Sequence, residues 1–591
     1  MENEKIDFGF TPSTYQEKIF DFIKHGNGNA VISAKAGSGK TSTCVSAIKL
    51  IRPKDKVLFL AFNKSIAEEL TEKLKGYDNV QVRTSHSLGY AMIRSNVEGD
   101  VELDEYKYRV YIKSHIGEIS DIGDKGLTRG ELYDYIDNIS SLVNLARFNL
   151  AQTPSEVRQL SVKYDIPVRF DECEMVMKVL EWGKSVTNKI DYTDMVWLPV
   201  ELSLNAKKFK KDFIFIDECQ DQSLASIQLF LKCFKRGTRF ISVGDEKQMV
   251  NMFAGSSEEA FDFMKNYPNT KLFDLPICYR CPKTIVELAQ TIVPDIKYRE
   301  NTPDGKILRN CLTKYLHSGD MVLSRSKAPL VKVYNKLLRH GVQCYIKGQD
   351  IGINLINMLE SVDAKELNTN LRADGVFVRL YDKLFEMRNK LMETRGLDYQ
   401  DATLSTYVTE KYDMINTLTI LAEHLDTKSE LIEHIKDIFS ENRDGVILST
   451  IHKAKGLEAD NVYILCRSSM PSQLAKKDWE REAEDNLIYV AYTRAKKKLG
   501  FISEQEIKPF GVSQGVDQVL DELGVIETMV CSVLGKTPVD RKENVEIARY
   551  NLNQGVTKIA NEHEDDNFKV IEPKECDDNN ELLSELDDLL V

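Results

Sequence analysis

The residues best suited to chemistry lie near the N-terminus, in a glycine-rich segment. The apolar run 29–33 leads into residues 34–41, which read AKAGSGKT, an order typical of a strand that turns into a helix around a phosphate. Glycine lets backbone N–H groups surround phosphate oxygens, and the helix N-terminus adds positive potential. Lys40 is suited to reach the β- and γ-phosphates of a nucleotide, and the Thr41 hydroxyl to hold Mg²⁺. The predicted phosphate-binding residues are Ala34, Lys35, Ala36, Gly37, Ser38, Gly39, Lys40, Thr41 and Ser42. Because Ala34 stands where the strict pattern has glycine, an ordinary glycine-rich turn is the alternative.

A second apolar run, 213–216, ends in the acidic sequence DECQD at 217–221. Such a run is typical of a buried parallel strand, and ligands of open α/β sheets bind beyond the carboxyl ends of the strands. We therefore expect Asp217 to hold Mg²⁺ and Glu218 to act as the general base for an attacking water. A solvated acidic loop is the alternative for this segment alone. A small kinase is disfavoured, because its nucleophile is a substrate hydroxyl and needs no glutamate beside the metal-binding aspartate.

This acidic sequence resembles that of superfamily 1 helicases, specifically the UvrD/Rep/PcrA-like group, and similar motifs follow in the same order over residues 10–500. The resemblance implies that Gln16 reads the adenine edge with a donor and an acceptor, and that Tyr279 stacks on the base. Because Ser42 stands where the family has an arginine beside adenine, we expect looser discrimination between bases. The other residues that the resemblance implies for nucleotide binding or catalysis are Gln248, Arg280, Gly456, Glu458 and Arg494.

The implied roles of these residues differ. Gln248 links the γ-phosphate to the DNA site, and Glu458 meets the ribose. Arg280 and Arg494 contact the γ-phosphate, and an arginine finger such as Arg494 raises the rate of hydrolysis about 10³–10⁵-fold.

The same resemblance implies contacts with a single DNA strand. Phe62, which follows the apolar run 57–61, and Phe253 would stack on bases, whereas hydroxyl and imidazole groups suit the phosphate backbone. A place in the core is the alternative for Phe62. The DNA-contacting residues that the resemblance implies are Phe62, Asn63, Thr84, His86, Phe253, Thr450 and His452. The chain departs from the family at Ser85, Asn251, Ala254 and Cys278, where an aromatic residue, tyrosine, arginine and asparagine are common.

The motifs divide the chain into two motor halves of α/β class, each interrupted by a mainly helical insertion. The resemblance implies that each half is a RecA-like P-loop domain with a parallel sheet. The predicted segments are the first motor domain (1–100 plus 205–285), its insertion (101–204), the second motor domain (286–350 plus 440–505), its insertion (351–439), a C-terminal extension (506–560) and an acidic, disordered tail (561–591).

A net charge of −13 over 591 residues is unusual for a DNA-binding protein, but much of it lies in one place. Residues 562–591 hold twelve acidic residues and two lysines, so the rest of the chain carries only −3. A groove of positive potential suffices to hold a single strand. Leucines recur at helical spacing in the acidic segment, which is therefore a solvated tail, a docking helix for a protein partner or a DNA mimic.

Eleven cysteines without a regular spacing fit a reducing compartment. The chain has no run of 18 apolar residues and no signal-peptide pattern. We expect no membrane association and a cytoplasmic location, or a nuclear one in a eukaryote.

These observations together predict an ATP- and Mg²⁺-dependent DNA helicase that moves along single-stranded DNA and acts at junctions between single and double strands. The resemblance, which extends to the F-box DNA helicase branch and phage relatives, implies 3′→5′ movement. One alternative is a translocase that removes bound proteins or recombinase filaments without processive unwinding. A helicase–nuclease is a second, although no nuclease-like Asp…Glu-x-Lys cluster follows residue 505. A non-catalytic scaffold is a third, and the intact Lys40, Glu218 and Arg494 argue against it.

Overall fold

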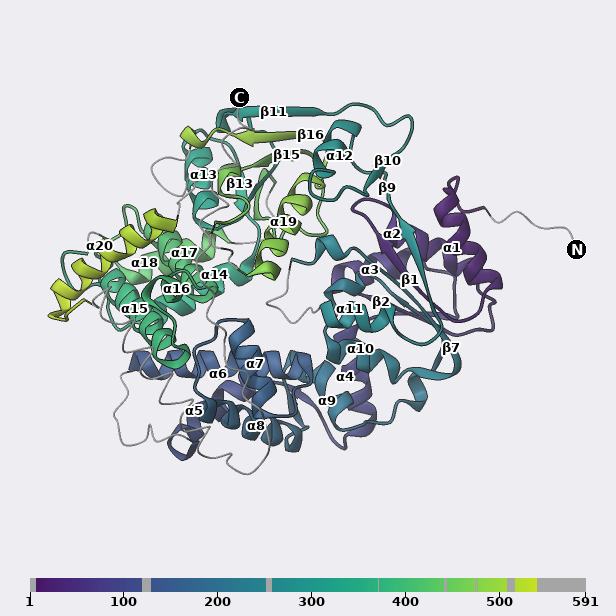
Figure 1. The fold of residues 1–591 in the computed structure, drawn as a ribbon, viewed down its shortest axis with the longest axis horizontal. Coiled ribbons are helices and arrows are strands. Elements are labelled where there is room, and N and C mark those ends of the chain that lie inside the picture. Colours follow the sequence, from purple (N-terminus) through teal and green to yellow (C-terminus); the bar gives the residue numbers. More distant parts are fainter. Residues whose placement is uncertain are drawn as a thin grey trace, which may run out of the picture.

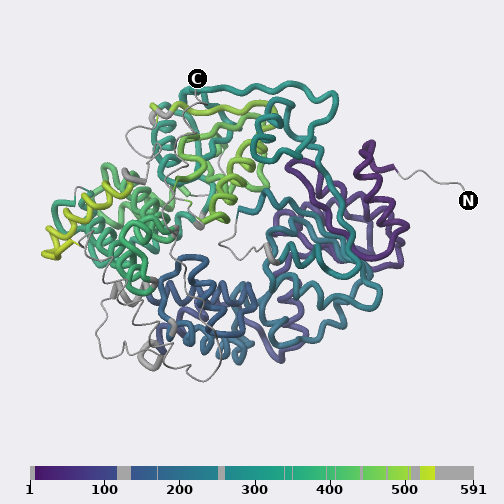
Figure 2. Tube along the Cα trace, in the orientation of Figure 1, coloured from purple at the N-terminus to yellow at the C-terminus, as the bar shows by residue number. Residues whose placement is uncertain are grey.

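The structure is a computed structural model that describes residues 7–119, 129–250, 258–369, 371–439, 444–473, 475, 477–506 and 516–538 (Figures 1 and 2). It contains two six-stranded sheets, and every strand pair within each of them is parallel. The predicted α/β class with two parallel-sheet units is therefore confirmed. Phe253, Asn251 and Ala254 lie outside the described residues, as does the acidic segment 561–591.

The first sheet has its earliest strand, β1 (Asn29–Ala34), next to one edge. Figure 2 shows the N-terminal part of the chain running beside strands that come much later in the sequence. The strands in order across the sheet are β3 (Val80–Thr84), β2 (Val57–Ala61), β6 (Lys211–Ile216), β7 (Phe234–Gly244), β1 and β8 (Thr270–Leu275).

Helices cover both faces of this sheet, because alternate residues of a strand point to opposite faces. On β2, Phe59 packs on one side, whereas Leu58 and Leu60 pack on the other, and all three are fully buried. The helices on the Phe59 side are α1 (Thr14–His25), α2 (Lys40–Ile48) and α3 (Lys64–Lys73). Those on the opposite side are α4 (Ser85–Asn96), α9 (Tyr192–Glu201), α10 (Leu224–Leu231) and α11 (Glu258–Lys265).

The second sheet has apolar, buried strands at its centre, such as β12 (Met321–Ser324) and β14 (Val446–Thr450). Its strands in order are β11 (Lys306–Cys311), β16 (Ala495–Ile502), β15 (Ala459–Ile464), β12, β14 and β13 (Cys344–Ile346). The helices packed on it include α12 (Lys283–Ala289), α13 (Ala328–Arg339) and α19 (Asp478–Tyr492). One core cluster joins the sheets, since it contains Ala36 and Cys278 together with Ile451 and Tyr489.

Each sheet is accompanied by a helical segment. The first helical segment comprises α5 (Lys107–Ile119), α6 (Arg129–Asn149), α7 (Pro154–Lys163), α8 (Phe170–Ser185) and α9. The second comprises α14 (Gln349–Glu360), α15 (Val376–Arg395), α16 (Tyr399–Thr403), α17 (Thr406–Leu421) and α18 (Lys428–Ile438). Helix α20 (Val516–Leu534) is fixed to α15 by a buried ion pair of 2.6 Å between Arg388 and Glu527. Short two-stranded sheets pair β4 (Glu102–Leu103) with β5 (Lys189–Ile190) and β9 (Ile277–Cys278) with β10 (Lys297–Tyr298). Among the helices in the described ranges, none is long and apolar enough to cross a membrane.

The two helical segments touch each other at the side away from the N-terminus (Figure 1). The Tyr407 hydroxyl of α17 donates to Asn138 Oδ1 of α6 at 2.7 Å. Arg158 of α7 donates to the Thr394 carbonyl of α15 at 3.1 Å. The chain therefore forms a closed circuit of four parts, with each sheet unit joined to the other and to its own helical segment.

Candidate nucleotide and DNA site

The carboxyl edge of the first sheet gathers most of the residues that were predicted to do chemistry. The glycine-rich turn follows β1, the acidic pair follows β6, and Asp245 follows β7. Within the turn, Gly37 and Gly39 have φ values of +66° and +78°, which favour glycine. A Cβ atom on Gly37 would lie 2.7 Å from Arg280 Cβ, so this glycine also lets the segment after β9 approach the turn.

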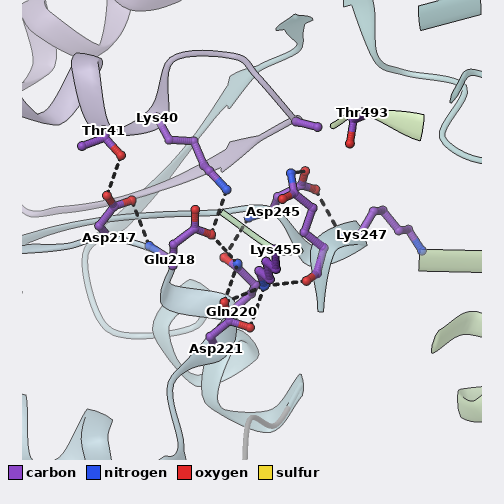
Figure 3. A network of polar contacts seen from close by, with 12 residues as sticks. Lys40, Thr41, Asp217, Glu218, Gln220, Asp221, Asp245, Lys247, Lys455 and Thr493 are labelled. Carbon is purple, nitrogen blue, oxygen red and sulfur yellow. Dashed lines mark hydrogen bonds and ion pairs between the residues drawn. The ribbon is translucent and has the colours of Figure 1, made fainter. Parts of the chain in front are cut away.

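The four central side chains form two short, largely buried pairs (Figure 3). Lys40 Nζ lies 2.8 Å from Glu218 Oε2, and the Thr41 hydroxyl donates to Asp217 Oδ2 at 2.7 Å. Burial, with the nearby Glu218 carboxylate, raises the pKa of Asp217 to about 6. Burial alone would also raise the pKa of Glu218, but Lys40 and Lys455 together lower it to about 2. Glu218 is thus held ionised, as a base must be.

The turn fits a phosphate group and a magnesium ion. The Ser38 hydroxyl is buried, and no described residue gives it a hydrogen-bond partner. A Cβ atom on Gly39 would meet nothing within 4 Å, so there is open space beside the turn. The Lys40 ammonium is fully charged, because its acidic neighbours raise its pKa even though burial opposes them. Hydroxyl and carboxylate oxygens from Thr41 and Asp217 are the ligand types that Mg²⁺ prefers.

Two arginines from different parts of the chain lie beside this group. Arg494 is 1% exposed, and its guanidinium lies 3.4 Å from Gln248 Oε1. Burial and the nearby Arg280 lower the pKa of Arg494 to about 10. Arg280 donates to Glu458 Oε2 at 2.7 Å and to the Thr493 carbonyl at 3.2 Å. The structure thus brings together all of the predicted γ-phosphate-contacting side chains at the junction of the two sheets.

Lys455 is a functional candidate that the sequence analysis passed over. It comes from the second sheet unit, and its ammonium lies 2.6 Å from Asp221 Oδ2, a fully buried carboxylate. It also donates to the Gln248 carbonyl at 2.5 Å, while the Gln248 side chain donates to Asp245 at 2.6 Å. Figure 3 shows Lys455 among the acidic residues of the first sheet. The available signal was its place in the motif that holds Gly456 and Glu458.

Tyr489 is a second such residue. It lies on α19 and is fully buried. Its hydroxyl accepts a hydrogen bond from the Ala36 backbone N–H at 2.8 Å and donates to Asp245 Oδ2 at 3.3 Å. One side chain of the second sheet unit thus reaches both the phosphate-binding turn and the residue that holds Gln248.

The two predicted base-binding residues, Gln16 and Tyr279, differ in how accessible they are to a nucleobase. Both polar atoms of Gln16 are engaged, because Nε2 donates to Thr43 at 2.9 Å and Oε1 accepts from the Ser13 N–H at 3.0 Å. Reading adenine would require Gln16 to exchange one of these bonds. Tyr279 is 38% exposed, and its N–H donates to the Gly37 carbonyl at 2.8 Å, which leaves its ring available for stacking. Ser42 is exposed on α2, and Gly456 has a φ of +83°.

The predicted DNA-contacting residues are spread over both sheet units. Phe62 is partly buried after β2, and Asn63 is exposed and caps α3 by accepting from the Ile66 N–H at 2.9 Å. Thr84 caps α4 in the same way, through the Ser87 N–H at 3.1 Å.

His86 follows on α4, and it is exposed. The ring of Tyr192 stands edge-on to it at 6.4 Å, and Tyr192 is 50% exposed. Tyr192 lies in no recognisable motif, although such a ring offers a base a stacking surface.

On the second sheet unit, Thr450 is buried at the end of β14 and His452 is partly buried. Burial and the cations Arg325 and Lys327 lower the pKa of His452 to about 4, although Glu484 opposes this. The His452 imidazole is therefore neutral near pH 7.

Comparison with known proteins adds independent information. Residues 15–268 match the UvrD/REP helicase N-terminal domain, and residues 305–506 match the UvrD-like helicase C-terminal domain. Together these matches cover well over half of the chain.

Three similar proteins are distant in sequence. A probable DNA helicase II homolog of Mycoplasma pneumoniae is 22% identical, over 81% of this chain and 82% of its own length. The ATP-dependent DNA helicase Rep of Buchnera aphidicola (subsp. Acyrthosiphon pisum) is 21% identical, over 80% and 92%. F-box DNA helicase protein 1 of Schizosaccharomyces pombe is 22% identical, over 83% of this chain and 60% of its own length.

Proposed function

Because the chain belongs to the UvrD/Rep/PcrA-like superfamily 1 helicases, a family of ATP-dependent DNA helicases, we propose that it hydrolyses ATP to move along single-stranded DNA in the 3′→5′ direction and separates strands at junctions. The observation that carries the proposal is the meeting of residues from both sheets around one phosphate-binding turn. Tyr489 and Lys455 come from the second sheet unit and contact the turn or its acidic neighbours in the first. Arg494, also from the second unit, donates to Gln248 of the first.

In this proposal, ATP lies between the two sheet units, which act as motor domains over 1–100 plus 205–285 and 286–350 plus 440–505. Lys40 and the turn hold the phosphates. Thr41 and Asp217 would hold Mg²⁺, which supplies charge neutralisation at the phosphates when it is bound. Arg280 and Arg494 approach the γ-phosphate.

Glu218 is proposed to take a proton from the attacking water, which its ionised carboxylate can accept. Its Oε2 atom accepts from Lys40 at 2.8 Å and from Gln220 Nε2 at 2.5 Å. A γ-phosphate that draws Lys40 toward itself would therefore leave Glu218 with Gln220 as its remaining partner.

We propose that DNA lies across the carboxyl edges of the two sheets, where Phe62, His86 and Thr450 are found. Gln248 contacts both sheet units, because its side chain donates to Asp245 of the first unit and accepts from Arg494 of the second, while its carbonyl accepts from Lys455 of the second. Closing of the sheet junction around ATP would shift the two DNA-contacting sets relative to each other. Alternating grip then moves the strand.

The first experiment measures ATP hydrolysis with and without single-stranded DNA, in the wild type, Glu218→Gln and Glu72→Gln. Glu72 is an exposed glutamate on α3 that pairs with Lys75 within the first sheet unit, so it is a matched control. We expect stimulation by DNA and a loss of about 10²–10⁴-fold in kcat for Glu218→Gln only. A rate that is indifferent to DNA, or a Glu218→Gln variant within tenfold of the wild type, would refute the proposal.

Strand separation is tested with labelled duplexes that carry a 3′ or a 5′ single-stranded tail. The proposal requires unwinding of the 3′-tailed duplex in the presence of ATP. Displacement of a bound protein from DNA without unwinding would favour the alternative of a protein-removing translocase.

A further inference from the structure

Residues 269–304 lie between the two matched family ranges and contain a short strand with no assigned role. This strand, β10, pairs in parallel with β9, and the Lys297 N–H donates to the Pro276 carbonyl at 2.8 Å. The pairing places residues 295–299 beside the segment that carries Tyr279 and Arg280.

Three residues of this stretch reach three different parts of the nucleotide site. Asp295 lies 2.7 Å from the ammonium of Lys35 in the phosphate-binding turn. Lys297 donates to the Tyr15 hydroxyl at 3.3 Å, directly beside Gln16. The stretch thus borders both the phosphate end and the base end of the site.

The third contact has the chemistry of a base-binding pair. The guanidinium of Arg299 lies 5.4 Å from the centre of the Tyr279 ring, in cation–π geometry. Tyr279 is 38% exposed and Arg299 is exposed, so neither is committed to the core. An aromatic ring and a planar guanidinium both stack on nucleobases. Residue 42, where the family has an arginine beside adenine, is a serine in this chain.

We propose that Arg299 binds the nucleobase together with Tyr279 and sets a preference for purine over pyrimidine nucleotides. A bicyclic purine offers the larger face for stacking, so it gains more from a guanidinium and a phenol ring than a pyrimidine does. The inference rests on the proposed nucleotide site, and it assigns a specificity-determining role to a residue outside the matched motifs.

The test is a binding measurement, so it does not depend on catalysis. Fluorescent N-methylanthraniloyl-ADP is titrated into the wild type, Arg299→Ala, Arg299→Lys and Arg309→Ala. Arg309 is an exposed arginine on β11 and serves as the matched control. Unlabelled UDP and inorganic tripolyphosphate, which lacks a base, are then used as competitors.

We expect Arg299→Ala to weaken binding of the ADP probe by about two- to fivefold, the range for a cation–π contact at an exposed site. The preference for ADP over UDP should fall, whereas tripolyphosphate affinity should not change. The affinity of Arg299→Lys for the ADP probe should be intermediate, because lysine keeps the positive charge but lacks the planar guanidinium.

Equal affinities in Arg299→Ala and Arg309→Ala would overturn the inference. A parallel loss of tripolyphosphate affinity would also overturn it, because Arg299 would then act through charge on the phosphates. Failure of the proposed function has a different signature, namely a wild type that binds the probe but hydrolyses no ATP in response to DNA.

Discussion

Replacing Tyr489 by phenylalanine removes a single oxygen atom from the junction of the two sheets. That oxygen accepts from the Ala36 N–H at 2.8 Å and donates to Asp245 at 3.3 Å, in a site where Tyr489 is fully buried. The ring itself remains, so packing against the surrounding core is preserved. The variant therefore isolates the hydrogen bonds between the second sheet unit and the phosphate-binding turn.

The expected loss of activity follows from the Ala36 N–H, which loses its hydrogen-bond acceptor. Without the hydroxyl, the Ala36 N–H has no acceptor when the sheets are closed together, and a buried unsatisfied donor costs about 1–3 kcal/mol. In an open arrangement water would satisfy the same group. The closed arrangement alone is therefore destabilised, and a cost of about 1–2 kcal/mol lowers DNA-stimulated kcat/KM for ATP by about 5- to 30-fold.

The assay compares DNA-stimulated ATP hydrolysis by Tyr489→Phe and Tyr492→Phe. Tyr492 lies on the same helix, is 3% exposed, and accepts from Arg467 at 2.7 Å away from the turn. We expect only the Tyr489 variant to lose activity. If both variants keep kcat/KM within twofold of the wild type, Tyr489 does not join the sheets in the active arrangement and the reasoning fails.

Three further predictions concern other contacts. Lys455→Met removes the cation that pairs with the buried Asp221 carboxylate, so we expect a lower thermal unfolding midpoint and a loss of stability of about 3–5 kcal/mol, the cost of a broken buried ion pair. Adding Asp221→Asn should recover part of the lost stability. An unchanged midpoint in the single variant would contradict the prediction. The pKa of His452 is about 4, below that of a histidine in the unfolded chain, so acidification between these two pKa values lowers the stability of the folded protein. Urea unfolding of His452→Gln should therefore show a smaller loss of stability on acidification than that of the wild type. The DNA affinities of the wild type and of His452→Gln should have the same pH dependence between about pH 6 and about pH 8, because the imidazole is neutral there. Tyr407→Phe removes the 2.7 Å bond to Asn138 between the helical segments, and we expect a larger radius of gyration by small-angle scattering, with an unchanged value counting against the contact.

The first sheet could be predicted because its strands carry their motifs at one edge. The apolar runs before Lys40 and Asp217 indicated buried parallel strands, and the carboxyl-end rule placed the acidic residues beside the turn. The structure brings these side chains within hydrogen-bonding distance, as expected. Pattern and topology together suffice here, because each side chain is positioned by its own strand.

Tyr489 and Lys455 could not be placed in the same way. Each reaches across from the second sheet unit, and no local pattern encodes how two separately folded sheets pack together. Arg299 follows a strand of only two residues, which is too short for any periodicity. The engagement of Gln16 did have a signal, since Ser13 and Gln16 have the spacing of a helix capping box.

The contact between Tyr407 and Asn138 has a mechanical consequence. The four parts contact one another in a ring, and Lys477 of the second sheet unit also pairs with Asp165 of the first helical segment at 3.0 Å. A movement of one part therefore moves its neighbours as well, so long as each part keeps its internal packing. A rotation at the junction of the two sheets would therefore strain the contact between the helical segments. That contact includes the Tyr407–Asn138 and Arg158–Thr394 hydrogen bonds. In the proposed mechanism, closing of the two sheets around ATP would therefore also change the contact between the two helical segments.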